Sequence, residues 1–252
     1  MSRLFIAAVA VGAGCGRIDF GNALDAPPLT YREQVLADHP LGYWRLGDSG
    51  TVAVDQTMNG DGIYSGSCTS SPGTIALDLD RATAFDETGG CIVSLGDRFN
   101  FPGASAFTLE GWFSIQQRSG GEYVFIKEAR TPGTAELPID GYGLIVDSVG
   151  IYAERVVDSS LGMTDRIALA PRFTHVVYSY DGAQLSLYLD GERVSQVPDA
   201  RVMRAFSADI NVGGFDTTFA LADGFIDEVA IYDHALSPER VSVHHDVGVN
   251  GP

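Results

Sequence analysis

The chain has 252 residues and a mass of 26.8 kDa, and 16 Lys and Arg against 33 Asp and Glu give it a formal net charge of −17. Apolar residues make up 45% and charged residues 19%, which is typical of a globular chain and excludes a disordered one. The negative charge argues against nucleic acid, and against a basic patch on an anionic membrane, because both need clustered Lys and Arg. The 30 glycines and 10% aromatic residues favour a turn-rich all-β protein.

The first 28 residues have the pattern of an export signal followed by a tether. Arg3 precedes an apolar run over residues 4–11, and small residues lead up to Cys15. Small residues before a Cys resemble the bacterial lipoprotein signal, in which Cys15 becomes the lipidated N-terminus, although Gly12 stands where that signal usually has Leu. We therefore expect a signal peptide over residues 1–14 and a tether over residues 15–28. An ordinary cleaved secretory signal stays open as the alternative.

Two further cysteines remain, Cys68 and Cys91. An even pair in an exported chain predicts a disulfide, and the short loop that it closes gives a stabilisation of about 3 kcal/mol. Two buried thiols or two metal ligands are the alternatives. The second of these is weak because no His or Cys lies at zinc spacing.

The rest of the chain predicts one domain over residues 29–249, built mainly from strands. Residues 31–37 form a short helix, and residues 107–115 alternate with apolar side chains on one face. Two Asp-Gly pairs, nine residues apart at Asp181 and Asp190, separate alternating runs and predict a meander of three antiparallel strands. Ser237 and Pro238 then open a final helix. Many short strands with turn signals indicate a two-sheet sandwich.

Several segments follow one another in order along nearly the whole domain: residues 36–48, 84–86, 107–112, 175–191, 224–232 and 235–237. Together they resemble laminin-G-like domains of the concanavalin A-like lectin/glucanase superfamily. The resemblance implies an all-β jelly-roll sandwich of two antiparallel sheets, with short helices at the two ends of the domain. It is specific for the fold but not for the function, because such folds host many activities.

Asp227 is the first candidate for a metal ligand. It lies in phase with Phe225, Val229 and Ile231, whose side chains we expect to point inward, and no Lys or Arg lies within seven residues of it. A carboxylate on an apolar face must be paired, hydrogen-bonded or bound to a cation. In the superfamily, an Asp at this strand often holds a structural Ca²⁺, and the resemblance implies Asp48 and Asp86 as its partners. The alternative is that Asp227 caps backbone amides.

Residues 55–62 begin like an EF-hand loop, with oxygen-bearing side chains at alternate positions and a Gly at the sixth. The twelfth position is Gly66 in place of the Glu that closes such a loop, and no helices are expected on either side. We therefore interpret this segment as a turn-rich loop.

Three aromatic residues are candidates for contact with a ligand: Trp112, Tyr142 and Tyr152. Trp112 shares a face with Glu110, opposite the apolar face of its strand, and we expect it to line a sheet on which superfamily members bind ligands. Ordinary packing is the alternative for each. The paired carboxylates of the superfamily's sugar-cleaving members are missing, and no triad or metal-hydrolase motif occurs. His244 and His245 are expected on the solvated side of the final helix.

These observations predict an exported, non-catalytic module that binds carbohydrate or mediates adhesion, with a polysaccharide or glycoprotein as partner and Ca²⁺ as a structural cofactor. A protein-interaction domain without glycan specificity is the second hypothesis, and a divergent glycoside hydrolase is the third. The expected location is extracytoplasmic, either secreted or at the bacterial cell envelope. Contact with a membrane is expected only through the lipid on Cys15.

Overall fold

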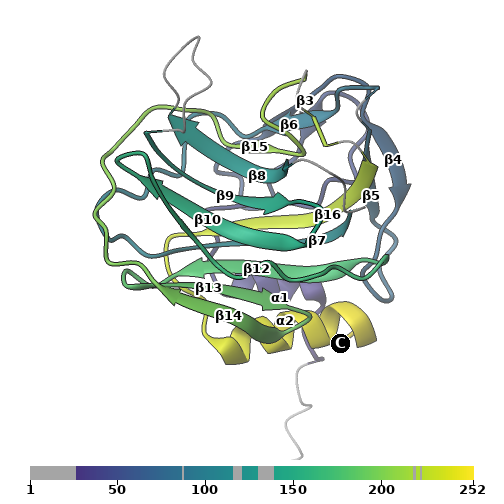
Figure 1. The fold of residues 1–252 in the computed structure, drawn as a ribbon. Coiled ribbons are helices and arrows are strands. Elements are labelled where there is room, and N and C mark those ends of the chain that lie inside the picture. Colours follow the sequence, from purple (N-terminus) through teal and green to yellow (C-terminus); the bar gives the residue numbers. More distant parts are fainter. Residues whose placement is uncertain (1–26, 87, 116–120, 130–138, 218–219, 222) are drawn as a thin grey trace, which may run out of the picture.

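The computed structural model describes residues 27–252, except 87, 116–120, 130–138, 218–219 and 222. The expected signal peptide and Cys15 lie outside the described residues. Over the described chain, two antiparallel sheets pack face to face, and two helices lie on one side of the sandwich (Figure 1). Neither of these helices combines the length and the apolar composition that crossing a membrane requires.

The first sheet has the order β14-β13-β12-β7-β16-β5-β4, and β1 pairs with the remaining part of β16. Its strands are β14 (Glu192–Pro198), β13 (Gln184–Leu189), β12 (Thr174–Tyr180), β7 (Phe107–Ile115), β16 (Asp223–Tyr232), β5 (Arg81–Asp86), β4 (Thr69–Pro72) and β1 (Gly42–Trp44). The second sheet has the order β11-β10-β9-β8-β15-β6-β3-β2. Its strands are β11 (Ser160–Met163), β10 (Ile151–Val157), β9 (Asp140–Val146), β8 (Glu122–Ala129), β15 (Asn211–Val212), β6 (Ile92–Ser94), β3 (Gly62–Ser65) and β2 (Val52–Ala53).

The meander of β12, β13 and β14 forms as the Asp-Gly pairs predict. At the second pair, Asp190 and Gly191 have φ of 50° and 81°, and a turn with positive φ at both central residues matches the right-handed twist of a hairpin. At the first pair, only Gly182 has positive φ, and the Asp181 carboxylate instead accepts the N–H groups of Ala183 and Gln184. Only the second turn therefore has the predicted form.

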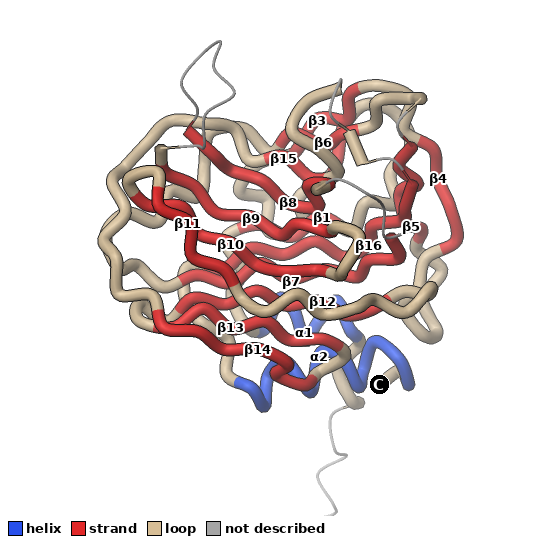
Figure 2. The backbone as a smooth tube through the Cα atoms, viewed as in Figure 1, coloured by secondary structure: helices blue, strands red, loops and turns tan. Residues whose placement is uncertain are grey.

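The main core lies between the sheets and contains the apolar face predicted for β7, namely Phe107, Leu109, Phe113 and Ile115. A second, smaller core lies on the outer face of the first sheet, under α1 (Tyr31–Ala37) and α2 (Pro238–Asn250). Figure 2 shows both helices on this side of the sandwich. Ser237 caps α2 and accepts the Arg240 N–H, with Pro at the first helical position, as the sequence predicts.

A disulfide joins Cys68 and Cys91, as expected for an even pair of cysteines. Cys68 lies directly before β4 of the first sheet, and Cys91 lies directly before β6 of the second. The bond therefore links the two sheets covalently at one edge of the sandwich.

Candidate functional site

Asp227 is buried, with 1% of its surface exposed, but it does not point into the main core. Glu228, next to it, has φ of 55°, and the pairing of β16 with β7 shifts register after Asp227. A bulge of this kind moves the following side chains to the opposite face. Val229 and Ile231 consequently point into the main core, whereas Asp227 lies across from Trp112 on the outer face. The expectation that Asp227 shares a face with Val229 and Ile231 was wrong for this reason.

Asp227 belongs to a cluster of three carboxylates with Asp80 and Glu228, whose oxygens lie within 4.8 Å of one another. Arg45 donates from Nη2 to Glu228 Oε1 at 2.8 Å, and the hydroxyl of Tyr43 donates to the other oxygen of Glu228. Arg45 Nε lies 3.0 Å from Asp80 Oδ2, a close ion pair without the geometry of a hydrogen bond. The Arg45 guanidinium thus contacts Asp80 and Glu228 of the cluster, and it also pairs with Asp78 Oδ2 at 2.7 Å.

Asp227 Oδ2 accepts the Thr74 N–H at 3.0 Å, but buried Asp227 Oδ1 has no hydrogen-bond partner among the described residues. Burial raises the pKa of Asp227 to about 7, and burial together with the charge of Asp227 raises the pKa of Glu228 to about 8. Both shifts mean that burial disfavours the ionised carboxylates more than Arg45 stabilises them.

The donor set of this cluster fits a hard cation such as Ca²⁺, which is bound through carboxylate and carbonyl oxygens. The backbone of Gly73 packs closely against this cluster. A Cβ at residue 73 would lie 2.5 Å from the carbonyl oxygen of Asp80 and 3.1 Å from Asp227 Oδ2. Asp80, Asp227 and Glu228 are therefore the residues that could hold a metal ion here.

The other two residues implied by the resemblance lie outside this cluster. Asp48 accepts the Val54 N–H at 3.1 Å and lines a separate pocket of about 160 Å³ with Tyr64 and Thr83. Asp86 accepts the Gly89 N–H at 2.6 Å and pairs with Asp223, four residues along β16 from Asp227. That separation is about 13 Å along a strand. The structure brings Asp80 and Glu228 to Asp227, and it does not bring Asp86 there.

The segment that begins like an EF-hand loop is a turn-rich loop, as interpreted from the sequence. Its first residue, Asp55, is buried, and its carboxylate accepts the backbone N–H groups of Tyr43, Thr57, Asn59 and Gly60. These amides occupy the oxygens that an EF-hand would direct at a cation.

Two of the three candidate aromatic residues are enclosed. Trp112 is 2% exposed and packs under α2, so closely that a Cβ at Gly248 would lie 2.4 Å from its ring. Tyr142 is 1% exposed in the main core, and its hydroxyl donates to the Phe99 carbonyl at 2.6 Å. Neither ring is accessible to a ligand. The expectation that Trp112 lines a binding sheet was wrong because the helices cover this face.

Tyr152 lies on the outer face of the second sheet and is largely buried there, with 9% of its surface exposed. It pairs with Ile145, and Ile145 pairs with Tyr123, so that the three form a row across β10, β9 and β8. The guanidinium of Arg166 lies 4.5 Å from the Tyr152 ring centre, and Arg166 Nε donates to Asp147 Oδ2 at 2.6 Å. Burial raises the pKa of Tyr152 to about 12.

Phe215 extends this row, because its ring centre lies 6.4 Å from that of Tyr123. Both described helices lie against the other sheet. We refer to this group of neighbouring side chains as the tyrosine row. It consists of Tyr123, Ile145, Asp147, Tyr152, Arg166 and Phe215.

A buried polar network on the outer face of the first sheet was not predicted. Glu110 accepts from His175 Nε2 and His244 Nδ1, both at 2.8 Å, and from the Tyr232 hydroxyl at 2.7 Å. His244 Nε2 lies 3.0 Å from Asp38 Oδ2 on α1. The network therefore joins β7, β12 and β16 to both helices. The expectation that His244 is solvated was wrong because it turns inward to Glu110.

The charges in this network stabilise one another. Burial would raise the pKa of Glu110, but His244 and His175 hold that pKa well below its usual range. Burial would lower the pKa of His244, but Glu110 and Asp38 raise it to about 9. Burial lowers the pKa of His175 despite its contact with Glu110. Glu110 is thus ionised and His244 protonated at neutral pH.

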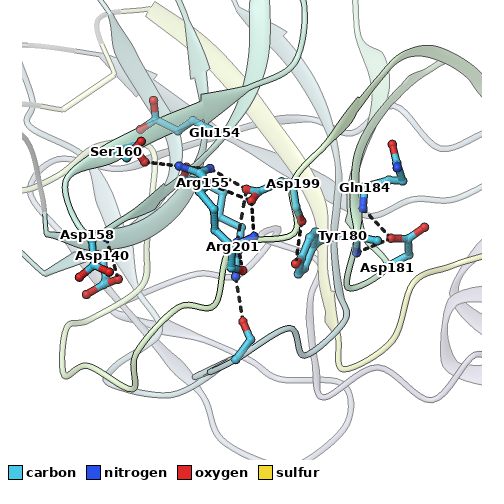
Figure 3. A network of polar contacts seen from close by, with 12 residues as sticks. Asp140, Glu154, Arg155, Asp158, Ser160, Tyr180, Asp181, Gln184, Asp199 and Arg201 are labelled. Atoms are coloured by element: carbon cyan, nitrogen blue, oxygen red, sulfur yellow. Dashed lines mark hydrogen bonds and ion pairs between the residues drawn. The ribbon is translucent and has the colours of Figure 1, made fainter.

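A second unpredicted network joins the sheets at their other end (Figure 3). Arg155 on β10 is fully buried, and it donates to Asp199 Oδ2 at 3.3 Å and to the Gly103 carbonyl at 2.9 Å. Arg201 donates to both oxygens of Asp199, and the Tyr180 ring lies 4.4 Å from the Arg155 guanidinium. Arg155 Nε has no hydrogen-bond partner among the described residues, but both terminal nitrogens of its guanidinium are paired, and this buried ion pair indicates a structural role.

Two packed antiparallel sheets with a buried carboxylate on the last strand define a lectin-like jelly-roll sandwich. Residues 87–242 match the Laminin_G_3 family of the concanavalin A-like lectin/glucanases superfamily. The chain belongs to this family. Comparison with curated proteins found no match.

Solved structures share the fold at low identity. Domain 4 of AbnA, a GH43 extracellular arabinanase from Geobacillus stearothermophilus in complex with arabinotriose, is 17% identical with a TM-score of 0.62, over 82% of this chain and 98% of that one. The binding domain of Paraclostridial Mosquitocidal Protein 1 is 11% identical with a TM-score of 0.63, over 82% of this chain and 52% of that one. A Trypanosoma rangeli sialidase is 16% identical with a TM-score of 0.53, over 81% and 32%. This chain thus spans about half of the toxin domain and about a third of the sialidase.

Proposed function

We propose that the protein is a non-catalytic carbohydrate-binding module and that the tyrosine row is its binding surface. The observation that carries this proposal is the alignment of Tyr123 and Tyr152 across three neighbouring strands, with Arg166 and Asp147 beside them. Aromatic rings contact the apolar faces of sugars, and a few polar groups fix their orientation.

Two further facts support the proposal. The chain belongs to a family of the lectin/glucanase superfamily, and a domain of the same fold has been solved with arabinotriose. The net charge of −17 repels anionic polymers and favours uncharged saccharides as ligands.

The test is binding of the described domain, residues 27–252, to an array of neutral polysaccharides. Tyr152→Ala removes one ring and the support of Arg166, and it is expected to weaken binding at least tenfold, which corresponds to about 1.4 kcal/mol. Phe173→Ala, on the first sheet, is the matched control and should bind like the wild type. Absence of binding by a folded wild type would contradict the proposal. Release of reducing ends from a bound polysaccharide would contradict its non-catalytic part.

We further propose that the protein is exported, either secreted or held at the cell envelope by a lipid on Cys15. The disulfide between Cys68 and Cys91 supports this location, because disulfides persist in oxidising compartments. Mass spectrometry of the mature N-terminus is the measurement. An unprocessed Met1 on the protein from its own host would contradict export through this signal.

A structural Ca²⁺ held by Asp80, Asp227 and Glu228 is proposed as the cofactor. The unpartnered, buried Oδ1 of Asp227 supports this site. Added Ca²⁺ is expected to stabilise the wild type by about 2.7 kcal/mol at a hundredfold excess over Kd, and Asp227→Asn should abolish this increase. Asp86→Asn is the control, because Asp86 lies about 13 Å from Asp227 along the strand. An equal rise in melting temperature for Asp227→Asn and wild type would place the ion elsewhere.

A protein partner is the second candidate function, and one observation favours it. Leu77 and Leu79 are 89% and 98% exposed on the loop that carries Asp80. Large apolar side chains held in solvent are typical of contact surfaces. A wild type that binds no glycan, together with loss of cell-surface attachment in Leu77→Ser/Leu79→Ser, is the result that would favour this function.

A further inference from the structure

A separate open cleft of about 490 Å³ lies near the edge of the second sheet. Its walls come from the loop before β3, the segment after β6 and the segment before β15, with β3 and β6 between them. The residues used below are Asn59, Asp61, Ile63, Ser94, Arg98 and Asp209.

One wall of the cleft is held rigidly. The Asp55 carboxylate accepts N–H groups from Asn59 at 3.0 Å and from Gly60 at 2.9 Å, and Asp55 N–H donates to Asp61 Oδ1 at 2.9 Å. These hydrogen bonds fix the backbone conformation of the loop that contains Asn59 and Asp61. A preorganised wall lowers the entropy lost when a ligand binds.

The facing wall carries Arg98. Its Nε donates to the Leu95 carbonyl at 2.7 Å, and its guanidinium lies 5.1 Å from the Phe99 ring centre and 5.6 Å from that of Trp44. A Cβ at Gly60 would lie 2.2 Å from Arg98 Nη1, so the glycine is what lets this guanidinium reach the loop. Arg98 is thereby a fixed donor inside the cleft.

The chemistry of the cleft suits a neutral, hydroxyl-rich ligand. The carboxylates of Asp61 and Asp209 accept hydrogen bonds from hydroxyl groups, whereas Arg98 donates them. Asn59 Nδ2 already donates to the Leu41 carbonyl at 3.1 Å, and its amide has one further N–H. Within the part of the chain that the structure describes, Asp209 Oδ2 makes a long contact of 3.4 Å with the Ser94 hydroxyl. Ile63, which is 60% exposed, adds an apolar surface.

The cleft and the tyrosine row share one face of the second sheet. Ile63 and Ser94 pair with each other, and they alternate with Tyr64 and Val93, which point into the main core. Tyr152 likewise alternates with core residues on β10. Four to five strand spacings, about 19–24 Å, separate β6 and β3 from Tyr152 on β10, and two to three spacings, about 10–14 Å, separate them from Tyr123 on β8. A disaccharide at Tyr152 therefore does not reach the cleft.

We infer that the cleft of Asn59, Asp61, Arg98 and Asp209 is a second saccharide subsite, and that the ligand is a polysaccharide chain lying across the strands of the second sheet. This inference rests on the proposed function, because it extends the ligand from the tyrosine row to the cleft. Two subsites on one chain act together, so affinity rises once a glycan is long enough to occupy both.

Titration calorimetry with arabino-, xylo- and cello-oligosaccharides of two to six units tests the inference. For the wild type, affinity is expected to rise at least tenfold between the shortest and the longest member of the series that binds. Asp61→Asn/Asp209→Asn should abolish this rise and leave disaccharide affinity unchanged. Asn keeps the acceptor for the Asp55 N–H, so the loop is preserved. Asp233→Asn/Asp246→Asn makes the same change of charge on exposed carboxylates near α2 and is the control.

Affinity that does not rise with length, or that rises equally in the cleft variant, would overturn the second subsite and leave the tyrosine row standing. Loss of length dependence in the α2 control as well would assign the effect to net charge and would also overturn it. A folded wild type that binds no member of the three series would overturn both this inference and the proposed function on these probes.

Discussion

Asp199→Ala is expected to lower the free energy of unfolding by about 3–5 kcal/mol, because it leaves a buried guanidinium without its carboxylate. Arg155 is fully buried and cannot turn to solvent, whereas Arg201 is partly exposed and can. The measurement is urea unfolding of the wild type and the variant. A decrease under 1 kcal/mol would contradict the structural role given to this network.

The paired variant Arg155→Met/Asp199→Leu is the control for that experiment. Replacing both members of a buried ion pair with apolar groups is often nearly neutral, although removing one is costly. The double variant is therefore expected to be more stable than Asp199→Ala. If both variants are equally unstable, the loss comes from packing and not from the unpaired charge.

The second large effect is the contribution of His244 to the pH dependence of the free energy of unfolding. Its pKa is about 9 in the folded protein and about 6.5 when unfolded, so the folded state retains a proton that the unfolded state releases. This contribution is fully present below pH 6.5 and is lost as pH rises through 9. The shift corresponds to about 3 kcal/mol. His244→Gln should therefore cost most stability below pH 6.5 and progressively less up to pH 9.

Unfolding free energies between pH 6.5 and pH 10 are the measurement for His244→Gln. Below pH 6.5 the wild type also loses stability through His175, whose pKa is lowered in the folded state. This loss does not cancel in the difference, because the charge of His244 helps to lower the pKa of His175 and His244→Gln removes that charge. The two proteins are therefore compared above pH 6.5. His245→Gln is the control, since that ring faces the exposed Asp246. Parallel curves for wild type and His244→Gln would contradict the ion pair with Glu110.

The fold could be predicted from local sequence patterns, because long-range contacts do not change the structure that these patterns favour. The alternation over β7, the Asp190-Gly191 turn and the Ser237-Pro238 helix start are each decided by neighbouring residues. The face of Asp227 was mispredicted because a bulge at Glu228 inverts the alternation of inward and outward side chains along β16. The bulge depends on the positive backbone φ of Glu228, and no sequence pattern predicts a positive φ at a Glu. A two-residue period can be extrapolated only as far as the next bulge.

The candidate site was less predictable because its members are distant in sequence. Asp80 reaches Asp227 through a loop whose path over β16 depends on tertiary contacts, such as the bond from the Ala76 N–H to the Gly248 carbonyl. Trp112 and Glu110 have the pattern of an exposed face, and they are buried because α1 and α2 dock on it. A strand alternation shows that two faces differ, but it does not show which face a helix covers.

The disulfide determines how the domain carries mechanical load. The described chain starts just before α1, which packs on the first sheet, whereas the proposed glycan lies on the second. Tension between a tethered N-terminus and a held polysaccharide would therefore pull the sheets apart across the core. Cys68 and Cys91 join the strands on the two sides of that plane, so the sheets cannot separate completely without breaking a covalent bond. In a reducing environment the same domain would resist such a force through noncovalent packing alone.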